Sequence, residues 1–220
     1  MFPFNKNNYL FFVLLLQFLI SREAYADNSE DFFVKLVDAA RERTRHFVVY
    51  NGTYRAIAYP MGDVPKNIGV CTDVVIRSYR SLGLDLQELV HEDMKSNFRL
   101  YPNIWGLSKP DTNIDHRRVR NLKVFLYRHG QSLPVTQNHD DYKPGEIVTW
   151  MLSGNQPHIG ILSDKRSPEG RPYVIHNIGW GPREEDVLFN YTIDGHYRYS
   201  GTVVTYSGND VPRSEETLSR

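Results

Sequence analysis

The spacing of apolar residues in this chain changes once, near Lys143, from a helical to a strand-like pattern. This change limits the folds that the chain can adopt. Before it, apolar residues recur at helical spacing over residues 28–45, 71–83, 84–98 and 113–129. After it, short runs bounded by turn formers predict strands at 147–151, 158–163, 173–178, 187–189 and 196–206. Two β-prone pieces, at 47–50 and 54–59, interrupt the helical part. Helices followed by an antiparallel meander predict an α+β fold, with N-terminal helices packed on a small antiparallel sheet.

The N-terminus has the pattern of a secretory signal peptide. Lys6 precedes an apolar run over residues 9–20, and Ala24-Tyr25-Ala26 offers a small-x-small cleavage site. Cleavage after Ala26 would remove residues 1–26 and place the protein in the periplasm or outside the cell. An uncleaved N-terminal anchor is the alternative. We expect residues 27–206 to form a single domain and the polar residues 207–220 to form a disordered tail.

Charge and cysteine content narrow the classes of partner. The 26 Lys plus Arg residues balance the 26 Asp plus Glu residues, which argues against a nucleic-acid-binding protein. No later stretch is apolar enough for a transmembrane span once the leader is removed. The one cysteine excludes an internal disulfide. An odd cysteine in an exported protein forms an intermolecular bridge or remains a free, reactive thiol.

That cysteine, Cys71, begins a predicted helix after a loop rich in Pro and Gly. A thiol on the first helical turn lies near unpaired backbone N–H groups and the positive end of the helix dipole. We therefore expect its pKa to lie below that of a free cysteine. The alternative is a small, inert core residue, which is the usual state of a free cysteine.

Two histidines complete a possible catalytic group. His158 begins one predicted strand and His176 lies on the next. Neighbouring antiparallel strands can bring two such side chains together on one face. If the sheet packs on the Cys71 helix, the three residues supply a nucleophile, a base and an orienting group. Asn177 could replace His176 as the orienting group, but strand alternation allows only one of them to serve.

The sequence resembles the NlpC-type and CHAP-type cysteine peptidases and amidases at residues 145–150, 158–161 and 174–176. It more closely resembles a bacterial family of exported proteins of unknown function that is distantly related to those enzymes. The motifs that carry this second resemblance lie at residues 69–75, 115–118, 157–160 and 176–179. The resemblance implies a papain-like fold and peptidoglycan as the substrate.

The same resemblance implies the roles of individual residues: Cys71 as nucleophile, His158 as general base and His176 as third triad member. Tyr59 lies roughly where those enzymes place an oxyanion-hole tyrosine, and the alternative for this residue is core or loop packing. Many of them have an acid before the cysteine, whereas here Val70 precedes it and Asp73 follows two residues later. Candidate substrate-binding residues are Asp73, Arg117, Trp150 and Trp180. For Arg117, the alternative is a solvated first helical turn.

We therefore expect an exported cysteine hydrolase that cleaves an amide or peptide bond, with peptidoglycan as the first candidate substrate. One alternative is a non-enzymatic module that binds peptidoglycan or a partner in the envelope. Another is a lipid acyltransferase or thioesterase that uses the same triad. No tight spacing of His, Cys and Asp predicts a zinc site, and we expect no metal or cofactor.

Overall fold

The computed structural model describes residues 30–201, so the predicted leader at 1–26 and tail at 207–220 lie outside the described residues. Four helices occur in this part of the chain: a first helix over residues 30–43, then α2 (Cys71–Ser81), α3 (Leu86–Asn97) and α4 (Val119–His129). Short 3-10 turns lie between α3 and α4 at Phe98–Leu100 and Asp115–Arg117, and a third follows α4 at His139–Asp141. None of these helices combines the length and apolar character needed to cross a membrane.

The main sheet has six antiparallel strands in the order β3-β8-β4-β5-β6-β7. Their bounds are β3 Gln131–Ser132, β4 Ile147–Leu152, β5 Gln156–Arg166, β6 Pro172–His176, β7 Arg183–Glu185 and β8 Thr192–Arg198. A separate parallel pair joins β1 (Val49–Tyr50) to β2 (Ile68–Gly69). The predicted α+β class is confirmed. Strands β4 to β7 form a meander, but β8 then returns to pair with β4.

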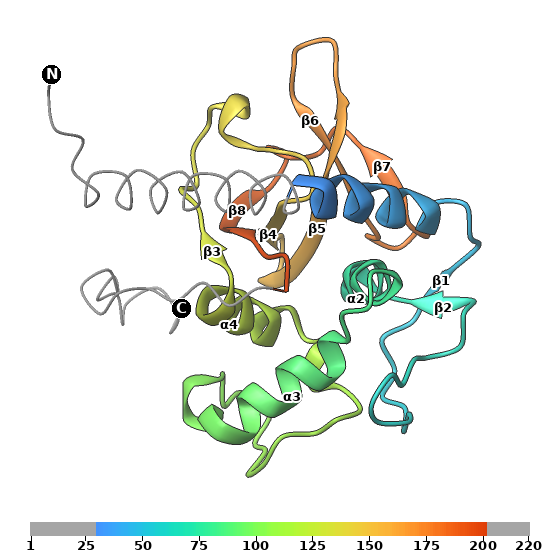
Figure 1. The fold of residues 1–220 in the computed structure, drawn as a ribbon, viewed down its shortest axis with the longest axis vertical. Helices are drawn as coiled ribbons and strands as arrows, with labels where there is room; N and C mark the ends of the chain where they lie inside the picture. Colours follow the sequence, from blue (N-terminus) through green and yellow to red (C-terminus); the bar gives the residue numbers. More distant parts are fainter. Residues whose placement is uncertain (1–29, 202–220) are drawn as a thin grey trace, which may run out of the picture.

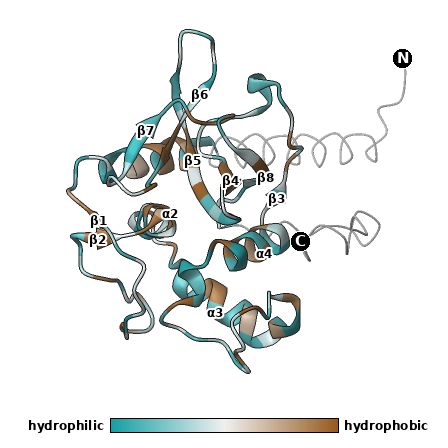
Figure 2. Cartoon of the chain, turned by 180° about the vertical axis from the view of Figure 1, so that it is seen from behind, coloured by the Kyte–Doolittle hydropathy of each residue, from teal (hydrophilic) through white to brown (hydrophobic). Residues whose placement is uncertain are grey.

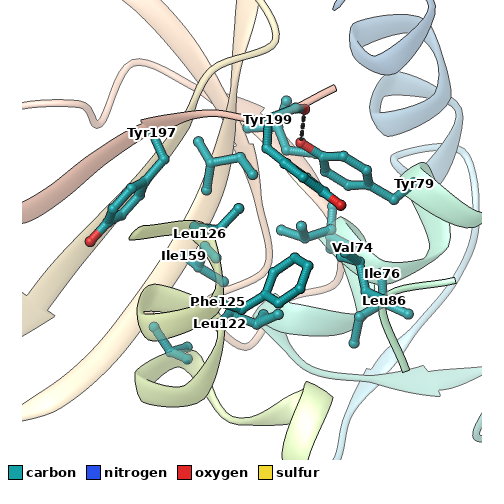
Figure 3. Close-up of a cluster of buried hydrophobic side chains, with 14 of the residues drawn as sticks. Val74, Ile76, Tyr79, Leu86, Leu122, Phe125, Leu126, Ile159, Tyr197 and Tyr199 are labelled. Atoms are coloured by element: carbon teal, nitrogen blue, oxygen red, sulfur yellow. Dashed lines mark hydrogen bonds between the residues drawn. The ribbon is translucent and has the colours of Figure 1, made fainter. Parts of the chain in front are cut away.

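Helices α2 and α4 cover one face of the sheet, while α3 lies beneath them and away from the strands (Figure 1). The main core fills the space between these helices and the strands (Figure 3). Ile159, Ile161 and Ile175 belong to this core and therefore point toward the helices. The Tyr79 hydroxyl donates to the Tyr199 carbonyl over 2.8 Å, which ties α2 to the chain after β8.

The opposite face of the sheet carries a second apolar cluster: Tyr142, Val148, Trp150, Leu162, Val174 and Leu188. The hydrophilic hairpin between β5 and β6 extends beyond the apolar strands (Figure 2). The predicted strand at 187–189 is wrong, because this segment turns over the second cluster, where the Leu188 carbonyl accepts a hydrogen bond from Trp150 Nε1. The edge strand is instead the charged β7.

Three boundaries differ from the sequence prediction in ways that affect the site. The segment 54–59 is not a strand. Its backbone is bound by side chains instead, and Asn113 accepts a hydrogen bond from the Ile57 amide. The helix predicted from 113 begins at Val119, because Asp115 holds a preceding turn through the Asp111 amide and Arg118. Strand β6 ends at His176 rather than at residue 178.

Candidate functional site

Helix α2 begins at Cys71, and its first turn is fixed by Asp73. Asp73 Oδ2 accepts a hydrogen bond from the Val70 backbone N–H over 2.7 Å. A carboxylate on the third helical residue that reaches back to the N-cap amide is half of a capping box, and it defines where the helix starts. The thiol is thereby held at the helix N-terminus.

Asp73 is also bound by Arg117 from the turn before α4. Arg117 Nε and Nη2 contact the two carboxylate oxygens at 2.8 and 2.9 Å, and both side chains are buried. A bidentate pair of this kind satisfies the carboxylate and fixes its geometry. The solvated alternative for Arg117 is wrong, because the two side chains are buried, bind each other and brace the turn that carries Cys71. Their role in substrate binding stays a prediction.

The Cys71 side chain is buried between α2, β5 and β1, with 4% of its surface exposed. Its sulfur accepts a hydrogen bond from the backbone N–H of Ile159, the residue after His158. Because Ile161 pairs with Ile175 and β6 ends at His176, Ile159 has no partner residue on β6. The backbone N–H of Ile159 is therefore free to bind the thiol. The hydroxyl of Tyr50, on β1, hydrogen-bonds the same sulfur.

The thiol pKa differs from the sequence prediction. Burial raises the pKa of Cys71 to about 11, and the nearby Asp73 carboxylate adds to the rise. The hydrogen bonds from Ile159, Thr72 and Tyr50 oppose it without cancelling it. The helix-terminus argument failed because a desolvated thiolate is more costly than a few N–H dipoles can offset. The resting thiol is neutral at pH 7.

We expect alkylation of Cys71 by iodoacetamide to be slow and to keep accelerating up to pH 10, because only the thiolate reacts. The chain has a single cysteine, so all label reports on this residue. Tyr50→Phe removes a group that stabilises the thiolate and should slow labelling further at pH 9. The measurement is the labelling rate from mass spectrometry at a series of pH values. A rate that levels off below pH 8 would contradict a raised pKa.

The two histidines meet on the other face of the sheet. His158 Nε2 and His176 Nδ1 lie 2.9 Å apart, and both side chains are buried. Trp150 pairs with His158 across β4 and β5 and stacks on its ring, with 5.7 Å between ring centroids. The Trp150 ring shields the contact between the histidines from water. The prediction that Trp150 binds substrate is wrong, since this side chain is almost fully buried.

A glycine allows this contact. A Cβ atom at Gly160 would lie 2.6 Å from Val174 Cγ1 and 3.2 Å from His176 Cβ. A side chain at position 160 would stand between the strands on the face that carries both imidazoles. The motif His-hydrophobic-Gly thus has a steric reason: the glycine two residues after His158 lets β6 approach closely enough for His176 to reach it.

Glu185 on β7 extends the arrangement, and sequence reasoning missed it. Its Oε2 lies 3.2 Å from His176 Nε2. A carboxylate only accepts, so His176 Nε2 carries the proton and a neutral His176 accepts at Nδ1. His158 must then donate from Nε2, which leaves His158 Nδ1 as an unprotonated base. The only available sequence signal was the acidic run Glu184-Glu185-Asp186.

Both histidines are neutral at pH 7. Burial, aided by the neighbouring His176, lowers the pKa of His158 to about 3. Burial also lowers the pKa of His176, and Glu185 opposes that change. A site whose thiol and imidazoles are all neutral differs from one with a preformed thiolate–imidazolium pair. This site can transfer a proton only when a reacting group stabilises the resulting charges.

Of the two candidates for the orienting group, His176 contacts His158 and Asn177 does not. The Asn177 side chain instead accepts a hydrogen bond from the Gly179 amide at 3.1 Å. Tyr59 is also placed elsewhere: its hydroxyl donates to Glu92 over 3.1 Å, and its ring packs on His91. Tyr50 rather than Tyr59 is the tyrosine at the thiol. The sequence distance from Cys71 did not reveal this, because the β1–β2 pairing brings Tyr50 back to the helix start.

Trp180 is the one predicted substrate-binding residue that stays accessible, with 81% of its surface exposed. It lies in the loop that follows His176, and the next residue, Gly181, lies against the backbone of Val48. Phe47 and Tyr50, on either side of Val48, are also exposed. Among residues 30–201, no group of three or more His, Cys, Asp or Glu side chains is placed to hold a metal ion.

Comparison with known proteins places the chain in a family. A family model described as "Domain of unknown function (DUF1287)" matches residues 37–199, a range that includes Tyr50, Cys71, both site histidines and Glu185. The uncharacterized protein YijF of Escherichia coli (strain K12) is 51% identical over 164 residues, which cover 74% of this chain and 80% of YijF. The chain therefore belongs to the DUF1287 family.

Proposed function

We propose that the protein is an exported cysteine hydrolase that cleaves an amide or peptide bond in peptidoglycan. The observation that carries the proposal is the hydrogen-bonded series His158–His176–Glu185, together with the contact of the Cys71 sulfur to the backbone N–H of Ile159, the residue after His158. A base whose tautomer is set by two further groups is the arrangement used for nucleophilic catalysis by a thiol. A buried cysteine with only a packing role would not need it.

In the first half of the reaction, His158 Nδ1 takes the thiol proton as Cys71 Sγ attacks the substrate carbonyl carbon. The tetrahedral intermediate then breaks its C–N bond, and His158 returns the proton to the leaving amine. The products of this half are a free amine and a thioester on Cys71. Because both resting groups are neutral, proton transfer and attack are coupled, and substrate binding must exclude water from the site.

In the second half, His158 removes a proton from a water molecule, whose oxygen attacks the thioester carbon. Loss of the thiolate releases the carboxylic acid, and the proton returns to Cys71. Two donors are suited to stabilise the oxyanion in both halves: the Tyr50 hydroxyl and the backbone N–H of Cys71 at the N-terminus of α2. The oxyanion-hole tyrosine that the resemblance implies is thus assigned to Tyr50 in this proposal.

The architecture supports a papain-like assignment. A nucleophile at a helix N-terminus that packs on an antiparallel sheet, with the base near the start of one strand and the orienting group on the next, agrees with the fold that the resemblance implies. Export rests on the leader pattern at residues 1–26 and would place the enzyme beside peptidoglycan.

A second candidate, a non-enzymatic module that binds cell-wall material, is favoured by one observation. Cys71 is almost fully buried and its thiol is protonated at pH 7, as expected of an inert core cysteine. This candidate gives Tyr50, Phe47 and Trp180 the role of an aromatic binding surface and gives the histidines a structural role.

Digestion of purified peptidoglycan by the mature protein, followed by mass spectrometry of the soluble fragments, tests the proposal. We expect new fragments with the wild-type protein and none with Cys71→Ala, at an unchanged melting temperature. His139→Ala, which alters a histidine far along the chain from the site, is the matched control and should keep full activity. A binding module would leave peptidoglycan intact in all three samples. A thioesterase would also leave it intact but would hydrolyse an acyl thioester, and an acyltransferase would leave it intact but would pass an acyl group to an acceptor.

A further inference from the structure

A groove of about 400 Å³ lies between the first helix and α2. One wall comes from the first helix and the residues after it, including Arg43 and His46, and the other comes from the face of α2 that carries Asp73 and Arg77. Val48 and Pro182 contribute apolar surface. The groove therefore combines an apolar lining with charged side chains, which suits a small organic ligand rather than a bare ion.

The charges on these walls do not balance within the protein. Each wall carboxylate has a basic partner: Glu42 with Arg45 at 2.9 Å, Asp63 with Arg77 at 2.9 Å and Asp73 with Arg117 at 2.8 Å. Arg80 is paired with Asp85. Two cations remain without a carboxylate among the described residues. Within residues 30–201, Lys66 makes no ion pair, and the one polar side-chain contact of Arg43 is to His46 Nε2 at 3.1 Å. In the described part of the chain, the groove therefore has no carboxylate to pair with Arg43 and Lys66.

The groove adjoins the catalytic residues along the chain. Its lining includes Val70, which precedes Cys71, and Asn177, which follows His176. It also includes Val48, two residues before Tyr50 on β1. The same backbone segments therefore carry the reacting groups and the groove wall.

We propose that this groove holds a carboxylate-bearing part of the peptide substrate, with Arg43 and Lys66 as its two cationic contacts. This inference rests on the proposed function and narrows its substrate to acidic peptides. Arg43 offers a planar fork that can bind a carboxylate with two hydrogen bonds, and Lys66 adds a second positive charge. Val48 and Pro182 would contact the aliphatic part of the same residue.

The test measures binding separately from cleavage. Cys71→Ala protein is titrated calorimetrically with a purified disaccharide–tetrapeptide from peptidoglycan, and with the same compound after its carboxylates have been converted to methylamides. We expect amidation to weaken binding at least about tenfold, as loss of a charge-assisted contact does. Adding Arg43→Gln and Lys66→Gln should weaken binding of the native compound by a similar factor and leave binding of the amidated compound unchanged.

Arg99→Gln with Lys109→Gln is the matched control, because it removes the same charge from exposed residues outside the groove. It should leave both affinities unchanged. Equal weakening by the control would indicate a general charge effect and overturn the proposal. So would unchanged affinity in the groove variant, or binding of inorganic phosphate but not of the disaccharide–tetrapeptide.

The two proposals fail separately. If wild-type protein cleaves peptidoglycan but the groove variant binds and cleaves as well as wild type, the hydrolase proposal stands and the groove proposal is wrong. If the groove variant loses affinity for the native compound but wild-type protein cleaves nothing, the groove is a binding site and the hydrolase proposal is wrong.

Discussion

His158→Ala should lower turnover of the peptidoglycan substrate by about 10³-fold or more, because the proposed mechanism loses its general base. The neutral resting state makes this effect large. With the pKa of Cys71 raised to about 11, thiolate formed without a base amounts to roughly one part in 10⁴ at pH 7. His158→Gln, which keeps more of the buried volume, should lose as much activity while folding normally.

His176→Ala should leave more activity than His158→Ala, with a loss of about 10²-fold, because His176 orients the base without touching substrate. Glu185 contacts His176 and not His158, so Glu185→Leu should lower activity by only about tenfold. Without Glu185, His176 can donate from Nδ1, which would force the unproductive tautomer on His158. Glu169→Leu, at an exposed position outside the series, is the control for Glu185.

The measurements are kcat and KM for each variant together with a melting curve. The expected order of kcat is wild type, Glu185→Leu, His176→Ala, His158→Ala, with KM little changed. Wild-type turnover in His158→Ala would remove the proposed mechanism. Equal and complete loss in all three variants, together with lowered melting temperatures, would point to a structural role for the series.

The sequence predicted the helices before the sheet, and it predicted that Cys71 begins α2. These features depend on local patterns: apolar spacing, turn formers and the Gly83 stop, whose φ of 83° confirms a left-handed helix end. It also predicted that His158 and His176 meet, because neighbouring strands in a meander pair with each other. Local pattern and nearest-neighbour pairing were sufficient for those parts of the site.

The rest depended on contacts between distant segments. Glu185 lies on a three-residue edge strand with no apolar alternation, so no strand was predicted there. Tyr50 reaches Cys71 only through the pairing of β1 with β2 across a long loop. Asp73 and Arg117 resembled exposed charges until folding buried them together. The pKa of the Cys71 thiol was determined mainly by burial, and the sequence motif at the helix start does not indicate how deeply the thiol is buried.

Acidification from pH 7 to pH 4.5 should destabilise the protein by several kcal/mol, because the fold buries neutral histidines. Burial lowers the pKa of His158 to about 3 and that of His116 to about 4, and it lowers the pKa of His176 as well. In the unfolded chain these side chains take up protons near pH 6.5. Between that pH and the lowered values, the unfolded state binds more protons, so the free energy of unfolding falls as pH falls.

The size of the effect follows from the same linkage. Each histidine that is protonated only in the unfolded state costs about 1.4 kcal/mol of stability per pH unit. His158 and His116 together give a limiting slope of about 3 kcal/mol per pH unit, to which His176 adds, and this is a large part of the 5–15 kcal/mol typical of a domain. The buried carboxylate of Asp93, whose partners include Arg128 and Tyr101, has its pKa lowered to about 2. Its stabilising contribution is lost only below about pH 4, outside this window.

Urea unfolding at pH 7.5, 6.5, 5.5 and 4.5 measures the slope, and one substitution isolates its origin. His116→Gln should reduce the slope between pH 5.5 and 4.5 by about one proton, or about 1.4 kcal/mol per pH unit. His46→Gln changes a histidine that is in contact with water in the folded protein and should leave the slope unchanged. The same slope in His116→Gln and in wild type would mean that His116 is not held neutral by burial. A wild-type stability that stays constant down to pH 4.5 would contradict the neutral state of the whole His158–His176 pair, and with it the proton transfer from Cys71 to a neutral base.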